Sequence, residues 1–239
     1  MGLEVEFPEF SKELSTDSIK VYDDIFPIDL LASIKEYALV SHRWGVRLEK
    51  TYHWALGLVG YPVGHGVPGF EELAEADWKE RHSDLPALVE LWELLKDKSP
   101  VGKRLRPRPT RVLVNGAVSA HDGYAHTDTL SLPSEDLLGH ALYTHIIYLN
   151  KNWNIDMGGA VEFYNVERTE IIKSVSPKFG RMVVFDSRIP HAGKSTCKFF
   201  QGIRMNLTLQ CKTTDIDYND PVKDPKGGLV VERNKKDNK

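Results

Sequence analysis

The stretch Tyr124-Ala125-His126-Thr127-Asp128 carries the pattern on which the fold prediction rests. A further histidine, His191, follows 63 positions after Asp128 in Ile189-Pro190-His191-Ala192-Gly193. Residues i and i+2 of an extended chain point to the same side, so the side chains of His126 and Asp128 can reach one point in space. A later strand could bring His191 to that point. Two imidazoles and one carboxylate would then occupy one face of an octahedral metal and leave three positions open for reaction.

Apolar segments surround this pattern in a definite order. Gly180 to Asp186 reads as a strand that runs into the loop bearing His191, and Ile203 to Leu209 reads as the next strand. Arg204 lies 13 residues after His191, within the alternation of that second strand. An inward-facing arginine needs a buried anionic partner, because an unpaired buried charge is costly. A dicarboxylate cosubstrate would supply the partner through a bidentate contact.

The triad alone is a weak signal. Nine histidines in 239 residues make chance pairings easy, and a buried histidine bonded to an aspartate is a common structural arrangement. The order of the neighbouring strands and of Arg204 is what favours a metal site.

A more specific resemblance lies between the two halves of the triad. The segments Tyr148-Leu149-Asn150-Lys151-Asn152-Trp153 and Gly158-Gly159-Ala160-Val161-Glu162-Phe163 are similar to the tyrosine-leucine-asparagine strand and double-glycine turn of prolyl hydroxylases. The chain from about Arg111 to Cys211 thus resembles the catalytic core of the 2-oxoglutarate/iron(II) dioxygenase superfamily, in its prolyl 4-hydroxylase-like branch. Val21 to Tyr37 resembles that branch less specifically, and residues 41–100 match nothing recognisable.

This resemblance implies a mainly β fold with flanking helices, a double-stranded β-helix of the jelly-roll or cupin-like kind. It implies iron(II) held by His126, Asp128 and His191, with 2-oxoglutarate and dioxygen as cosubstrates and ascorbate in support. Arg204 would pair with the distal carboxylate of 2-oxoglutarate and Tyr148 would hydrogen-bond to it, with Thr208 and Thr144 as weaker candidates. The reaction implied is hydroxylation of an unactivated C–H bond, with decarboxylation of 2-oxoglutarate to succinate.

The rest of the chain reads as one catalytic domain. Residues 1–105 are expected to give helical and loop support, 106–213 the β-helix core, and 214–239 a partly disordered tail. A strand is expected at 19–22, followed by a helix with Leu30, Leu31, Ile34 and Ala38 on one face. A second helix is expected from Ser83 or Asp84, with four apolar residues at helical spacing: Leu88, Leu91, Trp92 and Leu95. Further β-like runs cover 111–114, 141–149, 160–164, 181–185 and 203–211.

Other aromatic residues and histidines have two interpretations. Trp153, Trp54 and Tyr52 are predicted to line a substrate mouth, although they could equally be satellite core. The Gly/Pro-rich run 60–69 is a candidate lid. His145 is expected to be structural, because alternation places it on the face opposite Tyr148.

Composition limits the partners. The net charge of -3 gives no general reason to expect nucleic acid or an anionic membrane as a partner. Two cysteines are too few for a secreted disulfide scaffold, and the N-terminus lacks the features of a signal peptide. We therefore expect a soluble, cytoplasmic protein whose partner is a small-molecule or peptide substrate. Two other functions stay open: a cupin-like metal-dependent isomerase or hydrolase, and a non-catalytic β-sandwich binding module.

Overall fold

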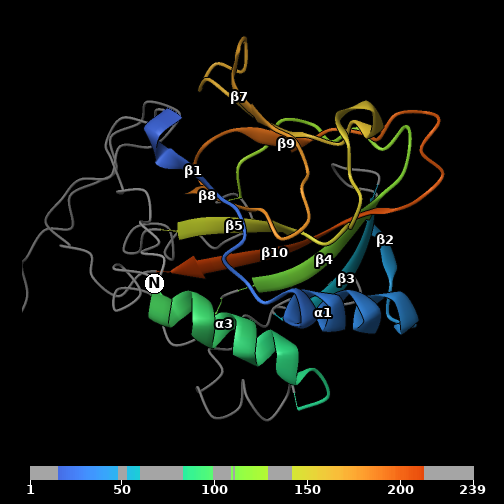
Figure 1. Ribbon diagram of the computed structural model, residues 1–239. Helices are drawn as coiled ribbons and strands as arrows, with labels where there is room; N and C mark the ends of the chain where they lie inside the picture. Colours follow the sequence, from blue (N-terminus) through green and yellow to red (C-terminus); the bar gives the residue numbers. More distant parts are fainter. Residues whose placement is uncertain are drawn as a thin grey trace, which may run out of the picture.

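The structure, a computed structural model, describes residues 16–47, 53–59, 83–98, 109, 111–128 and 142–212. Its strands form two antiparallel sheets, one above the other (Figure 1). The larger sheet contains, in order across it, β1 (Ile19–Tyr22), β8 (Met182–Asp186), β5 (Leu142–Tyr148), β10 (Arg204–Lys212), β4 (Arg111–Ala117), β3 (His53–Val59) and β2 (Gly45–Arg47). The smaller sheet contains β7 (Ile171–Val175), β6 (Val161–Tyr164) and β9 (His191–Gly193). These facing sheets form the predicted double-stranded β-helix.

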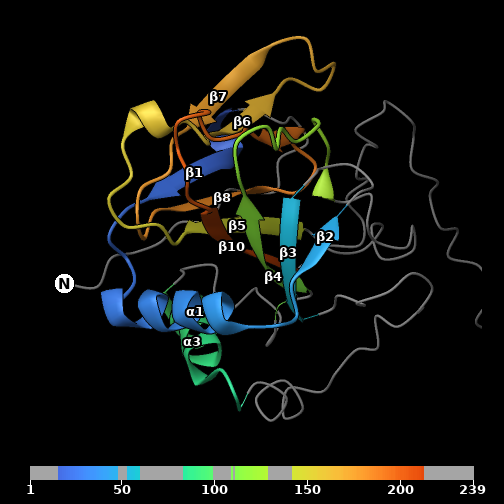
Figure 2. The same cartoon turned by 90° about the vertical axis from the view of Figure 1, so that its right-hand side faces the viewer.

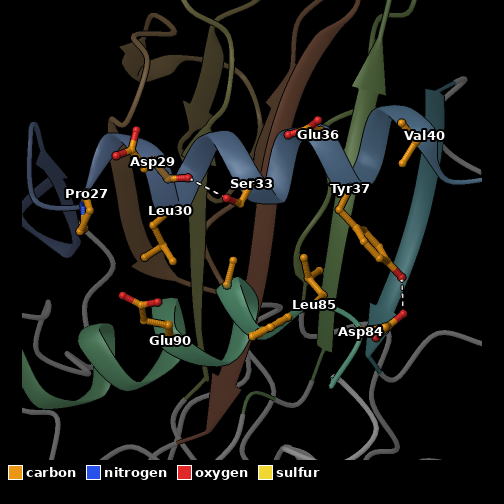
Figure 3. A pocket seen from close by; sticks show the side chains of 12 residues that line it. Pro27, Asp29, Leu30, Ser33, Glu36, Tyr37, Val40, Asp84, Leu85 and Glu90 are labelled. Carbon is orange, nitrogen blue, oxygen red and sulfur yellow. Dashed lines mark hydrogen bonds between the residues drawn. The ribbon is translucent and has the colours of Figure 1, made fainter.

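Two helices cover the face of the larger sheet that points away from the smaller one (Figure 2). They are α1 (Ile28–Val40) and α3 (Pro86–Lys98), and short 3-10 turns lie at Thr16–Ser18 and Ile155–Met157. Leu30 of α1 and Leu85, just before α3, are buried where the helices meet, and the Tyr37 hydroxyl donates to Asp84 at 2.8 Å (Figure 3). The apolar stripes predicted on both helices are therefore confirmed as core.

Alternation along the central strands separates two environments. In β5, Tyr143 and Ile147 belong to the core beneath the helices, whereas Ile146 and Tyr148 belong to the core between the sheets. β10 follows the same rule, because Met205, Leu207 and Leu209 face the helices. Its other side chains, from Arg204 to Gln210 in steps of two, face the smaller sheet. The space between the sheets is therefore where polar groups of the larger sheet converge.

The sheet extends further toward the N-terminus than the sequence indicated. Three strands, β1, β2 and β3, precede residue 106, and β3 pairs with β4 from Trp54↔Gly116 to Val59↔Val112. Of these only β1 was expected, and the short strands β7 and β9 were also missed. β2 and β9 have three residues each, too few to show a period-2 pattern. The expected lid at 60–69 and the tail at 214–239 lie outside the described residues.

Within the described ranges, none of the helices has the length and hydrophobicity needed to cross a lipid bilayer.

His145 is fully buried on the helix side of β5, with its Nδ1 3.7 Å from the Cys211 sulfur. Burial lowers the pKa of His145 to about 3, against 6.5 for an exposed imidazole. The His145 imidazole therefore binds a proton more tightly in the unfolded chain than in the folded one. The contribution of neutral His145 to the free energy of unfolding is fully present above pH 6.5 and is lost as the pH falls toward 3. Between pH 6.5 and pH 5 the loss amounts to about 2 kcal/mol.

We expect His145→Asn to reduce the fall in unfolding free energy between pH 7 and pH 5 by about 2 kcal/mol, as measured by urea denaturation. His42→Asn, at an exposed histidine, should leave that fall as it is in the wild type. If the free energy of unfolding depended on pH equally in the wild type and in His145→Asn, the loss of stability could not be assigned to His145.

Candidate metal and cosubstrate site

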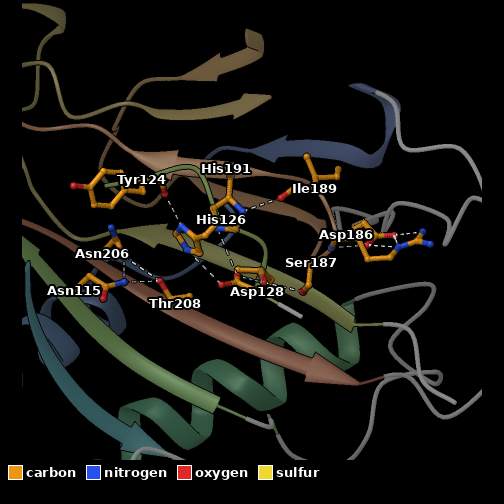
Figure 4. A network of polar contacts seen from close by, with 12 residues as sticks. Asn115, Tyr124, His126, Asp128, Asp186, Ser187, Ile189, His191, Asn206 and Thr208 are labelled. Carbon is orange, nitrogen blue, oxygen red and sulfur yellow. Dashed lines mark hydrogen bonds and ion pairs between the residues drawn. The ribbon is translucent and has the colours of Figure 1, made fainter. Parts of the chain in front are cut away.

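The three predicted metal ligands converge at one point between the sheets (Figure 4). One ligand atom from each of His126, Asp128 and His191 lies within 4.8 Å of the others. The Nε2 atoms of His126 and His191 lie 3.7 and 3.6 Å from the Asp128 carboxylate oxygens. A backbone bridge between His126 and His191 aligns the two segments, which continues the smaller sheet by one residue pair. The triad therefore joins residues far apart in sequence through ordinary β pairing.

Backbone carbonyls fix the orientation of both imidazoles. The Nδ1 atom of His126 lies 2.9 Å from the Tyr124 oxygen, and that of His191 lies 2.9 Å from the Ile189 oxygen. A carbonyl oxygen only accepts, so each Nδ1 carries the proton and each Nε2 lone pair is directed at the triad centre. Outer hydrogen bonds of this kind are typical of metal-binding histidines.

The protonation states also suit a metal. Burial by itself would raise the pKa of Asp128, but His191, His126, the Thr144 hydrogen bond and the Arg111 charge together hold it below its usual value. Burial lowers the pKa of His191 to about 4. Near neutral pH the site therefore offers an ionised carboxylate and a neutral His191 imidazole, the forms that bind a cation.

Arg204 is a buried cation without an anionic partner among the described residues. Its side chain is 5% exposed, and Nη1 donates to the carbonyl oxygens of Gly159 at 2.7 Å and Lys194 at 3.4 Å. The Nε atom has no hydrogen-bond partner, and burial lowers the pKa of the guanidinium. A charge buried in this way is costly unless a ligand carboxylate pairs with it.

Tyr148 shares this end of the site. It is 1% exposed, and its hydroxyl lies 3.4 Å from the Val175 carbonyl oxygen, a weak hydrogen bond. Burial raises the pKa of Tyr148 to about 12, so the phenol stays protonated and can donate. A neutral donor beside a buried cation suits a carboxylate.

One cavity of about 110 Å³ connects the triad with Arg204 and Tyr148. Its walls come from β4, β5, β6, β9, β10 and the loop that carries His126. Besides the residues already described, they include Arg111, Leu113, Asn115, Ala117, His121, Gly123, Thr144, Ile146, Val161, Gly193, Asn206, Thr208 and Gln210.

The sequence matches the model of the 2OG-Fe(II) oxygenase superfamily over residues 114–209. The chain contains a 2OG-Fe(II) oxygenase domain. It is a 2-oxoglutarate-dependent dioxygenase, and iron(II), 2-oxoglutarate and dioxygen are its cofactor and cosubstrates. Both the triad and the unpaired arginine suit these groups. No curated protein matches the chain in sequence.

Solved structures share the fold of this oxygenase at low sequence identity. A prolyl hydroxylase from Trichoplax adhaerens, in complex with a hypoxia inducible factor peptide fragment, is 17% identical with a TM-score of 0.53 over 82% of this chain and 84% of that one. A prolyl-4-hydroxylase from Pseudomonas putida is 17% identical with a TM-score of 0.52 over 83% and 93%. A non-heme alpha-ketoglutarate-dependent carbocyclase from nogalamycin biosynthesis is 12% identical with a TM-score of 0.55 over 82% and 79%.

Two predicted site residues of the oxygenase have contacts other than those expected. Thr144 donates a 2.6 Å hydrogen bond to Asp128, so its hydroxyl is directed at a ligand of the triad rather than at Arg204. Trp153 donates to the Gly158 carbonyl oxygen at 3.1 Å and packs edge-on against Phe200, which makes it a support of the double-glycine turn. Trp153 does not line the cavity.

The other predicted site residues are Thr208, Tyr52 and Trp54. Thr208 lines the cavity as expected, and its hydroxyl donates to Asn206 at 3.1 Å. Tyr52 and the side chain of Trp54 lie outside the described residues, so their contact with substrate stays a prediction.

Sequence analysis missed several polar groups of the cavity. Asn115 donates to Asn206 and Thr208 across neighbouring strands, at 3.2 and 3.0 Å. Asn206 and Gln210 follow Arg204 at intervals of two, so the alternation already visible in β10 could have found them. Nothing in the local sequence of Arg111 distinguishes it from an exposed charge at the start of a strand.

The turn at Gly159 leaves room for Arg204. A Cβ at Gly159, whose φ is +76°, would lie 2.8 Å from Cδ of Arg204. We expect Gly159→Ala to lower the unfolding free energy by about 1–3 kcal/mol through backbone strain. It should also weaken 2-oxoglutarate binding by displacing the guanidinium. Urea denaturation and calorimetric titration of 2-oxoglutarate in the presence of Mn(II) would measure the two effects.

The matched control is Gly45→Ala, where an added Cβ would meet only the Ala55 oxygen at 4.0 Å. This variant should keep the cosubstrate affinity of the wild type. Wild-type affinity in Gly159→Ala would show that Arg204 does not depend on the turn.

Proposed function

We propose that this oxygenase hydroxylates an unactivated C–H bond, with iron(II) held by His126, Asp128 and His191. The observation that carries the proposal is that Arg204, a buried arginine with no carboxylate partner among the described residues, lies in the same cavity as the triad. Such an arginine has no purpose in a metal-dependent isomerase or hydrolase that needs no dicarboxylate. Because the family match confirms the oxygenase prediction, neither that alternative nor the binding module is proposed.

The cosubstrate is proposed to lie along the cavity between Arg204 and the triad. Arg204 binds the distal carboxylate through its guanidinium, and the protonated Tyr148 hydroxyl donates to the same group. Val161 and Ile146 supply apolar walls beside the chain of the dicarboxylate. Iron(II) bound at the triad supplies the redox chemistry that couples decarboxylation of 2-oxoglutarate to oxidation of the substrate. The protein contributes orientation and exclusion of water.

The substrate is proposed to be a prolyl residue of a peptide, a free amino acid or a small metabolite. Among the similar folds, one structure holds a peptide and another acts in nogalamycin biosynthesis. Fold therefore does not choose between these classes, since specificity belongs to the groups at the cavity mouth. The carboxylate ligand Asp128 favours hydroxylation, because it occupies a position that a halogenase leaves open for halide.

The test is succinate production from 2-oxoglutarate with iron(II), ascorbate and dioxygen. We expect turnover in the wild type, including slow turnover without the true substrate, and its loss in Asp128→Ala and Arg204→Ala. Arg204→Lys keeps the positive charge but loses the planar guanidinium that can donate two hydrogen bonds to one carboxylate. Its KM for 2-oxoglutarate should therefore rise by roughly 10- to 100-fold, or about 1.4–2.8 kcal/mol.

Arg168→Ala is the control for removal of an arginine, since Arg168 is exposed in the turn between β6 and β7. It should turn over 2-oxoglutarate like the wild type. Absence of succinate from iron-loaded wild type, with candidate substrates of all three classes supplied, would count against the proposal.

A further inference from the structure

Outside the triad, a buried hydroxyl group bonds to the Asp128 carboxylate, and a second buried hydroxyl bonds to the first. Thr144 Oγ1 donates to Asp128 Oδ2 at 2.6 Å, and Thr144 Oγ1 lies 2.9 Å from Ser187 Oγ. Both residues are buried, with Thr144 at 0% and Ser187 at 1% exposure. We propose that Thr144, supported by Ser187, is a positioning residue that fixes Asp128 for metal binding.

The number of hydroxyl hydrogens sets the donor and the acceptor in each of these two hydrogen bonds. The Thr144 hydroxyl has one hydrogen, and the ionised Asp128 carboxylate can only accept it. In the contact with Ser187, Thr144 is therefore the acceptor and Ser187 the donor. The chain runs from Ser187 through Thr144 to Asp128, and each hydrogen bond polarises the next one.

Ser187 also holds the backbone of Asp128. The Asp128 N–H donates to the Ser187 carbonyl oxygen at 3.0 Å. Ser187 lies between Asp186 and Arg188, which form a buried ion pair with a 2.7 Å contact. Ser187 therefore contacts Asp128 directly through its backbone, and through Thr144 by its side chain. The end of β8 and the middle of β5 together determine where the carboxylate points.

The hydroxyl, rather than the volume, of Thr144 is what distinguishes it from an apolar core residue. A valine has nearly the same shape and a high propensity for strands. An isosteric valine would leave a carboxylate oxygen with one hydrogen bond fewer in a buried site. Loss of an outer-shell partner of this kind typically lowers metal affinity about 10- to 100-fold.

This inference rests on the proposed metal site, and Mn(II) binding tests it without any turnover. The loss of the free Mn(II) signal in electron paramagnetic resonance gives the dissociation constant. We expect Thr144→Val to raise that constant by about 10- to 100-fold and Thr144→Ser, which keeps the hydroxyl, to stay within about threefold of the wild type. Ser187→Ala should raise it by about threefold, because only the support of Thr144 is lost.

Thr196→Val is the matched control, because Thr196 is a buried threonine whose hydroxyl has no hydrogen-bond partner among the described residues. It should bind Mn(II) like the wild type. If Thr144→Val does not fold, as judged by circular dichroism, Ser187→Ala alone decides, and wild-type affinity in it overturns the proposal.

Wild-type affinity in a folded Thr144→Val, or equal weakening in Thr144→Val and Thr144→Ser, would also overturn the proposal. Failure of the wild type to bind Mn(II) would instead overturn the metal site itself, and this inference with it. In the Thr144→Val background, Ser187→Ala should add no further loss, because Ser187 acts through the hydroxyl that is already gone.

Discussion

Arg204 and Asp128 are buried in the same cavity and do not neutralise each other. Among the described residues Arg204 donates only to carbonyl oxygens, and Asp128 is stabilised by the two imidazoles, the Thr144 hydroxyl and the charge of Arg111. Arg204 therefore lacks a counter-charge from the described protein groups. A dicarboxylate would supply it, a dication at the triad would pair with Asp128, and the remaining features of the site keep these two charges apart.

The strand pattern of the larger sheet maintains that separation. β10 places Arg204, Asn206, Thr208 and Gln210 on one face in steps of two, and the apolar residues between them pack beneath α1 and α3. β5 does the same with Thr144 and Tyr148, which lie four residues apart on one face of the strand, Thr144 beside Asp128 and Tyr148 toward Arg204. The cavity therefore has a metal end and a guanidinium end because strands hold a fixed rise per residue. The helices pack on the opposite face, and none of the described residues that line the cavity comes from α1 or α3.

Glycine and backbone carbonyls set the finer geometry. Gly159 and Gly193 let the Arg204 side chain pass close to the backbone, since a Cβ at Gly193 would lie 3.1 Å from Nη2. The carbonyl oxygens of Tyr124 and Ile189 accept from Nδ1 of His126 and His191 and so determine the tautomers of these histidines. These contacts come from the backbone, so substitutions far from the triad can disturb it by moving a loop.

Much of the candidate site could be predicted from the sequence. The spacing of His126, Asp128 and His191 and the strand period around Arg204 gave the candidate metal site, and the family resemblance added the predicted roles of Arg204 and Tyr148 at 2-oxoglutarate. Only the folded structure shows that Thr144 bonds to Asp128, that Trp153 supports a turn, that β2 and β3 extend the larger sheet, and that His191 begins a short strand. Period-2 alternation says which face of a strand a side chain occupies. It does not say which residue of a distant strand lies opposite, because register and sheet order depend on contacts between segments far apart in the chain.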